Sequence, residues 1–201
     1  MRKAIKQQGL LLGTVLLLIS NIFVKGLGFF YRVVLVRLLG AEGMGLIEMV
    51  TPLFSFLLVL AGCGIQPALS QTIAGKGRGL RNDYFRAALI ILLLSGSLVT
   101  LAAYAFAPLI IAYFVPDQRI YLCFRAILPA IFIISIASAW RGCFQGLRQV
   151  SALGMSQNIE QICRVLLGVY LARLLLPGGL EVAVSAASYA TVAGELAGFA
   201  Y

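Results

Sequence analysis

The chain has 201 residues, of which 61% are hydrophobic and 11% are charged, and its mean hydropathy is +0.99. This composition is too apolar for an ordinary soluble domain and predicts an all-α polytopic membrane protein. Histidine is absent, which removes the usual metal ligand and the usual general base. The net charge of +9 comes from cations at span ends and within spans, so we expect no nucleic-acid partner.

Hydrophobic stretches long enough to cross a hydrocarbon core of about 30 Å recur along the chain. We expect about six transmembrane helices, at approximately residues 10–39, 46–73, 84–106, 120–140, 152–176 and 181–201, the last one truncated. Glycine- and proline-containing breaks separate these spans. Pro108 is expected to end the third helix, so that the apolar residues up to position 114 form a short interfacial piece.

The cations are distributed unevenly between the two sides of these spans. Nine Lys and Arg residues fall near the N-terminus and in the predicted loops 75–86 and 141–150, whereas three fall on the opposite side. By the positive-inside rule, the N-terminus and these two loops are cytoplasmic. We therefore expect a multi-pass protein of the cell membrane, in contact with the lipid bilayer, with its N-terminus inside.

The first predicted span carries two permanent cations among apolar residues that are typical of the middle of a bilayer. Its Leu, Ile, Val and Phe residues favour insertion by about 4 to 8 kcal/mol, and two central cations oppose it by about 5 to 7 kcal/mol. On a helix, the polar and small residues of this span lie within about 60° of one another: Thr14, Asn21, Lys25, Gly28 and Arg32. This stripe predicts that the helix faces a polar interior.

The second and fifth spans repeat this pattern. One face of the second carries Glu48, Pro52, Ser55, Gly62 and Gln66. One face of the fifth carries Gln157, Glu160, Gln161, Arg164 and Gly168. Glu160 and Arg164 are four residues apart and can neutralise each other, which is more often a structural than a functional arrangement.

These stripes favour a cationic, water-accessible cavity that binds an anionic ligand. The candidate substrate-binding residues are Lys25, Arg32, Asn21, Glu48 and Gln66, with Arg37, Arg125, Glu160 and Arg164 as further possibilities. In the alternative interpretation, the cations pair with carboxylates of other helices and only fix the packing. Arg125 could equally be an interface anchor that snorkels to water.

Catalytic motifs are missing from the sequence. It contains no Gly-x-Ser-x-Gly elbow, no intramembrane aspartate pair and no His-Glu-x-x-His motif. The glycine-rich segment 75–79 lacks the spacing of a nucleotide-binding loop. We therefore expect a transporter rather than an enzyme, with no cofactor and no metal site.

Three segments carry a resemblance to a known family. Residues 25–46 (KGLGFFYRVVLVRLLGAEGMGL) resemble the first-helix signature of the polysaccharide and lipid-linked oligosaccharide flippases. Residues 141–148 (RGCFQGLR) and 156–164 (SQNIEQICR) resemble the fourth-loop and fifth-helix motifs of that family. The chain is thus identified as a member of the multidrug/oligosaccharidyl-lipid/polysaccharide exporter superfamily, most similar to the stage V sporulation protein B and lipid II flippase branch.

The resemblance implies two lobes of six helices around a cavity that opens alternately to each side and moves polyprenyl-pyrophosphate-linked sugars. In the related lipid II flippases, cations of the first two helices line the cavity, and Arg32 and Lys25 occupy comparable positions here. Arg37 also matches the signature, but it lies about 140° from Arg32 around the helix. A complete member has twelve to fourteen spans, so we expect this chain to be the N-terminal lobe, without its C-terminal lobe.

Two other functions are compatible with the sequence. A multidrug or toxin exporter of the same superfamily would exchange cations with protons or sodium and would need intramembrane carboxylates, whereas the first span here is dominated by basic groups. Alternatively, the chain is a non-transporting fragment or an assembly subunit. The leading prediction is a flippase for an anionic lipid-linked glycan.

Overall fold

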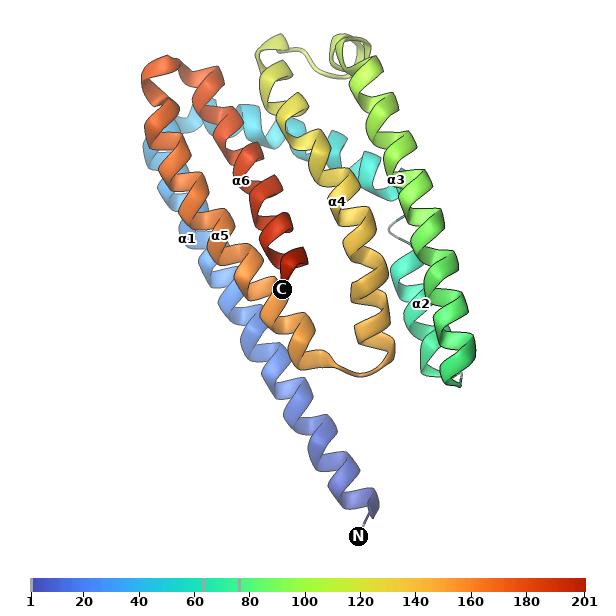
Figure 1. Cartoon of the computed structure of the whole chain (residues 1–201). Helices are drawn as coiled ribbons and strands as arrows, with labels where there is room; N and C mark the ends of the chain where they lie inside the picture. Colours follow the sequence, from blue (N-terminus) through green and yellow to red (C-terminus); the bar gives the residue numbers. More distant parts are fainter. Residues whose placement is uncertain (1, 63, 76) are drawn as a thin grey trace.

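The computed structural model describes residues 2–62, 64–75 and 77–201, and its regular elements within these ranges are all helices (Figure 1). In chain order they are α1 (Arg2–Leu60), α2 (Ile65–Ala74), α3 (Arg78–Phe114), the 3-10 turn η1 (Gln118–Ile120), α4 (Tyr121–Gly146), α5 (Val150–Leu175), the 3-10 turn η2 (Leu176–Gly178) and α6 (Leu180–Ala200).

Within the described part of the chain, four helical segments are long and apolar enough to cross a membrane. They are Leu18–Leu60, Gly79–Phe114, Gln118–Gly146 and Leu180–Ala200. This confirms the prediction of an all-α polytopic membrane protein. The polar half of α5 lowers its hydropathy and keeps it out of this set, so the six-span count stays a prediction.

Helix α1 consists of two segments that meet at a kink. Gly40 has φ 71° and ψ −177°, a non-helical conformation that glycine adopts far more easily than other residues. The apolar part of α1 covers 43 residues, which at 1.5 Å per residue is about twice the thickness of a bilayer core. In Figure 1 the blue segment rises from the N-terminus, and the cyan segment that follows it passes behind α4 toward α2. The predicted break after the first span is confirmed.

The second predicted span, residues 46–73, is not one continuous helix, and that prediction was wrong. Gly62 has φ 110°, and α2 begins only at Ile65. The break leaves backbone groups without helical partners, and the hydroxyl of Ser95 on α3 donates to the Ala61 carbonyl at 2.9 Å. The two glycines at positions 62 and 64 make a helix interruption inexpensive here.

Three other predicted boundaries also differ from the structure. Helix α3 continues through Pro108 to Phe114, because a proline removes one hydrogen bond while an unwound segment in lipid would expose many more backbone groups. Helix α4 extends to Gly146, so Arg141 lies in a helix and not in a loop. Likewise, α3 already begins at Arg78, and most of the predicted loop 75–86 is helical.

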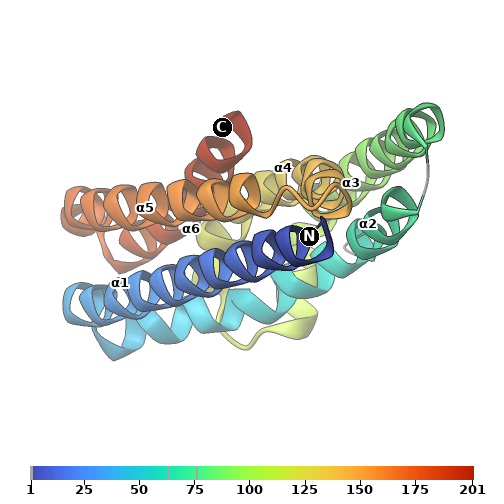
Figure 2. The ribbon, with the colours of Figure 1, turned by 90° about the horizontal axis from the view of Figure 1, so that it is seen from below.

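Helices α5, α6, α4 and α3 follow one another across the bundle (Figure 1), and α6 packs between α5 and α4. Figure 2 shows the two segments of α1 on one side of α5, α4 and α3. The buried apolar core joins α1, α4 and α6, and its members include Leu46, Val50, Phe124, Leu128 and Val184. Helix α5 contacts both α1 and α6, whereas α4 contacts α3, α6 and α2. Cys123 is buried in the core, and Cys63 lies outside the described residues.

Candidate functional site

The polar face of α1 is exposed in this structure. Asn21, Lys25 and Arg32 are all exposed, although most of their neighbours on α1 are apolar. Arg32 Nη2 lies 2.7 Å from Glu48 Oε1, and the two side chains are 63% and 50% exposed. Among the described residues, no carboxylate lies within 4.0 Å of Lys25. The side chain of Thr14 lies outside the described part of the chain.

The kink at Gly40 explains why Arg32 meets Glu48. The arginine precedes the kink by as many residues as the glutamate follows it. When a chain folds back on itself as two helices, positions equally far from the turn lie at the same level. The structure therefore brings together two of the predicted site residues, whereas Lys25 has no carboxylate nearby among the described residues.

The face of α1 next to its polar stripe packs against α5. A Cβ at Gly28 would lie 3.2 Å from Gln161 Nε2, so Gly28, which shares the stripe with Lys25 and Arg32, lies at its edge against α5. Asn158 Nδ2 donates to Ser20 Oγ at 3.3 Å, and the Tyr31 ring lies directly against Gly168. The hydroxyl of Tyr31 is buried and has no hydrogen-bond partner within the described residues.

Gln66 does not contact the ion pair that Arg32 and Glu48 form on α1. The break at Gly62 ends the helical register that would have placed it on the face of Glu48. Gln66 lies on α2, and its backbone carbonyl would be 2.8 Å from a Cβ at Gly142 of α4. No hydrogen bond or ion pair between described residues links it to Lys25 or Arg32.

Two further candidate cations have different surroundings. Arg37 is exposed on α1, with no ion pair to another described residue. Arg125 is also exposed on α4, but its guanidinium lies over two aromatic rings, 5.7 Å from the centroid of Tyr104 and 5.5 Å from that of Tyr121.

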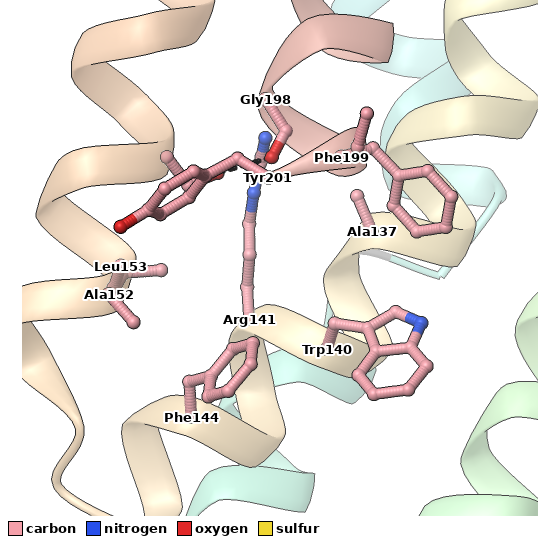
Figure 3. A pocket seen from close by; sticks show the side chains of 11 residues that line it. Ala137, Trp140, Arg141, Phe144, Ala152, Leu153, Gly198, Phe199 and Tyr201 are labelled. Carbon is pink, nitrogen blue, oxygen red and sulfur yellow. Dashed lines mark hydrogen bonds between the residues drawn. The ribbon is translucent and has the colours of Figure 1, made fainter.

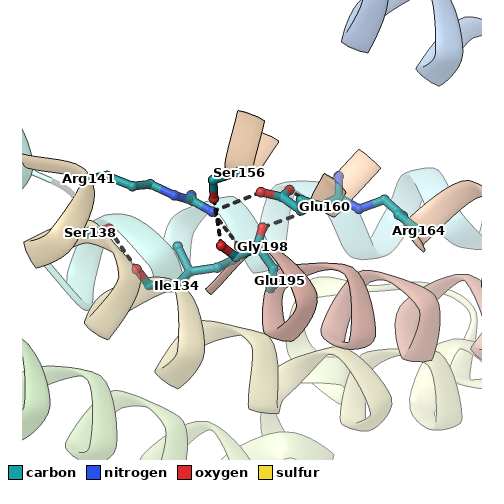
Figure 4. Close-up of polar contacts among 8 residues, drawn as sticks. All are labelled: Ile134, Ser138, Arg141, Ser156, Glu160, Arg164, Glu195 and Gly198. Atoms are coloured by element: carbon teal, nitrogen blue, oxygen red, sulfur yellow. Dashed lines mark hydrogen bonds and ion pairs between the residues drawn. The ribbon is translucent and has the colours of Figure 1, made fainter. Parts of the chain in front are cut away.

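Glu160 and Arg164 belong to a cluster of four charges that joins α4, α5 and α6 (Figure 4). Arg164 Nη2 lies 2.6 Å from Glu160 and 3.2 Å from Glu195, and Arg141 Nη2 lies 2.9 Å from each glutamate. The side chains of Arg141, Glu160, Arg164 and Glu195 are 18%, 12%, 24% and 6% exposed. The charges cancel in number, which is what a buried set of ions requires.

The sequence predicted only half of this charge cluster. The pair on α5 follows from its spacing of four residues, and its contact is confirmed. Arg141 was assigned to a cytoplasmic loop, because the apolar run before it ends at Trp140. Glu195 was overlooked, although a carboxylate inside the apolar run of α6 is itself a signal, since it needs a cation from another helix.

A cavity of about 310 Å³ lies beside the cluster, between α4, α5 and the end of α6 (Figure 3). Arg141 extends from α4 toward Gly198 and contributes to the cavity and to the charge cluster at once. Aromatic side chains surround it, namely Trp140, Phe144, Phe199 and Tyr201. Ser156 Oγ donates to the Gly198 carbonyl at 2.6 Å and holds α5 against α6.

The end of the bundle where α3 meets η1 carries a separate, exposed ion cluster. Arg119 lies 2.7 Å from Glu42, just after the α1 kink, and 2.9 Å from Asp117. Hydrogen bonds from Arg119 hold the pKa of the Asp117 carboxyl below its usual value of 3.8. These contacts tie the kink of α1 to the connection between α3 and α4.

Comparison with known proteins decides the family. A family model described as "Polysaccharide biosynthesis protein" matches residues 10–201. The chain belongs to this family.

Curated relatives agree with this assignment. The chain is 35% identical over 199 residues to stage V sporulation protein B of Bacillus subtilis (strain 168), a match that covers 97% of the chain and 38% of the relative. It is 25% identical over 207 residues to the lipid II flippase MurJ of the same organism, covering 94% of the chain and 38% of MurJ. A third relative, the uncharacterized membrane protein YabM of that organism, is 25% identical over 194 residues, with 96% and 36% covered.

The chain thus spans less than two fifths of the length of these relatives. No solved structure matches it. The family relationship confirms the resemblance found in the sequence motifs, and one of these relatives, MurJ, is named as a lipid II flippase.

Proposed function

We propose that residues 1–201 form the N-terminal transmembrane lobe of a two-lobe flippase that moves polyprenyl-pyrophosphate-linked saccharides by alternating access. The cargo would be a polysaccharide or peptidoglycan precursor, and a second lobe would complete the cavity. In this proposal the N-terminus is cytoplasmic, α5 is the fifth span and α6 the sixth. Family membership and the name of the relative MurJ, a lipid II flippase, support the transport class.

One observation carries the proposal: α1 exposes Lys25 and Arg32 on a helix long and apolar enough to cross a membrane. A cation facing lipid at the middle of a bilayer costs about 2.5 to 3.5 kcal/mol. This cost disappears when the same face lines a water-filled cavity. A pyrophosphate is a fitting ligand for such a face, because arginine binds phosphate oxygens through two parallel hydrogen bonds.

Glu48 gives the site a resting state. Its carboxylate forms an ion pair with Arg32 at 2.7 Å when no ligand is bound, and half of its side chain is exposed. Exposed ion pairs contribute about 0 to 1 kcal/mol, so a doubly charged pyrophosphate can displace Glu48 at little cost. Asn21 adds a neutral hydrogen-bonding group on the same face of α1.

The test is transport by the intact protein in liposomes, with a fluorescent polyprenyl-pyrophosphate saccharide as cargo. Replacing Arg32 by Ala should abolish movement between leaflets without loss of folded protein. Arg32→Lys should restore only part of it, since the charge survives but the two-pronged hydrogen bonding is lost. Arg37→Ala is the matched control, because Arg37 is exposed on the same helix without an ion pair to another described residue. Normal transport by Arg32→Ala would refute the assignment of this residue.

A cation exporter is the second candidate function, and the exposed carboxylate of Glu48 is the observation that favours it. The two functions respond oppositely to Glu48→Gln. An exporter that binds cations through this carboxylate loses transport of a cationic dye, whereas a flippase for anions keeps its cargo and binds it more tightly.

A further inference from the structure

A second cationic site lies between α3 and α4. Arg125 Nη1 donates to the Tyr121 hydroxyl at 3.2 Å, and the rings of Tyr121 and Tyr104 flank the guanidinium. Neither the polar face of α1 nor the buried charge cluster includes these residues. In the described part of the chain, no carboxylate lies within 4.0 Å of Arg125.

Pro129 helps to fix this arrangement. Because proline has no backbone N–H, the carbonyl of Arg125 four residues earlier lacks its usual helical donor. The Tyr104 hydroxyl takes that place and donates to the Arg125 carbonyl at 3.1 Å. The guanidinium is therefore held at a defined position, and one of its five N–H groups is used by Tyr121, which leaves the others for a ligand.

An apolar groove of about 360 Å³ begins at Tyr104. Its walls are Ser97, Thr100, Leu101 and Tyr104 of α3, and Pro129, Phe132 and Ile133 of α4. Positions four, seven and eight residues after Arg125 share its face of the helix, so the cation and the α4 wall form one stripe. A fixed positive charge thus stands at one end of an apolar channel.

We propose that this site binds one anionic phospholipid, with its phosphate on Arg125 and an acyl chain in the groove. Arg125 is four residues from the start of α4, about 6 Å along the helix, which matches the depth of a headgroup layer. Tyrosines at that depth are typical of the membrane interface. Arg125, which has no carboxylate beside it among the described residues, selects a negative headgroup, and the groove accommodates the acyl chain. This proposal requires only that the bundle lies in a membrane, and it does not depend on a flippase activity.

Native mass spectrometry of the detergent-solubilised protein tests this site. The wild type, offered equal amounts of phosphatidylglycerol and phosphatidylcholine of identical chains, should retain one phosphatidylglycerol preferentially. Arg125→Gln should lower the affinity for that lipid by roughly fivefold or more, the factor expected for one interfacial cation. Arg125→Lys should recover part of the preference. Arg173→Gln, a change at another exposed arginine, should leave it intact.

A second variant tests the groove. Ile133→Trp fills the channel and leaves Arg125 in place, so it should weaken long-chain phosphatidylglycerol while sparing a short-chain analogue. Circular dichroism identifies any variant that fails to fold, and the Lys and Trp variants then still decide the matter. Undiminished phosphatidylglycerol preference in Arg125→Gln, an equal loss in Arg173→Gln, or tighter retention of an undecaprenyl phosphate than of phosphatidylglycerol at Arg125 would each overturn the proposal.

Discussion

Replacing Glu195 by Gln is the sharpest test of why four charges lie inside the bundle. The substitution keeps the shape of the side chain and an oxygen that can accept hydrogen bonds from Arg141 and Arg164. It removes one negative charge from a cluster in which two arginines balance two glutamates. All four side chains are less than a quarter exposed, so solvent does little to screen the imbalance.

Two explanations of the cluster predict different magnitudes. If the cluster stabilises the protein through its hydrogen bonds, the substitution lowers stability only slightly, because polar contacts between membrane helices average about 0.6 kcal/mol. If the cluster stabilises the protein because its charges cancel, the substitution leaves one uncompensated cation inside the membrane, which costs about 2.5 to 3.5 kcal/mol. We expect the larger cost, since breaking a buried ion pair by removing one partner is typically worth about 3 to 5 kcal/mol.

Thermal unfolding in detergent measures the difference. A loss of about 3 kcal/mol corresponds to a fall in Tm of about 6 to 12 °C for a chain of this size. The double variant Arg141→Gln with Glu195→Gln restores neutrality and should recover part of the loss. Glu181→Gln, on the same helix and outside the cluster, is the matched control. A shift of only about 2 °C in Glu195→Gln, with no recovery in the double variant, would refute the neutrality argument.

Three further predictions follow from other parts of the chain. Tyr31→Phe should leave stability unchanged or raise Tm, because it removes a buried hydroxyl without a partner in the described structure; a clear fall in Tm would reveal a missing partner such as a bound water. Asp117 should titrate below its usual pKa in a pH series followed by NMR, so its pairing with Arg119 stabilises the fold above that value and is lost as pH falls through the lowered pKa; a normal titration in the wild type, unaffected by Arg119→Gln, would contradict the pairing. In a variant without native cysteines, a cysteine replacing Arg148 should be protected from impermeant reagents in intact cells, whereas one at position 117 should react; the reverse pattern would invert the proposed orientation.

The sequence predicted the helical class and most of the turns, because apolar runs and glycines are local signals. The kink at Gly40 is an example: a glycine between two long apolar runs predicted it, and a backbone conformation favoured by glycine confirms it. Pro108 misled the prediction, since a proline ends helices in water far more readily than in a bilayer. The break at Gly62 was missed because hydropathy alone does not separate a continuous span from two short helices.

The site was harder to predict because its contacts link distant parts of the chain. Helical angles placed Lys25 and Arg32 on one face, and both are exposed, but periodicity could not show that Glu48 pairs with Arg32 across the kink. The same limit explains why Glu195 was overlooked: its partners come from α4 and α5, and nothing in the neighbouring sequence of α6 identifies them.

Exposure separates the roles of the two groups of ion pairs. Arg32 and Glu48 are half or more exposed, so their contact contributes little free energy and can exchange for a ligand. The cluster around Glu195 is buried and joins three helices, so opening it would strand charge in the membrane. We therefore expect α4, α5 and α6 to move together as one unit during any transport cycle. The α1 hairpin, hinged at Gly40 and holding its ion pair loosely, is then the part of the lobe best suited to respond to a bound anion.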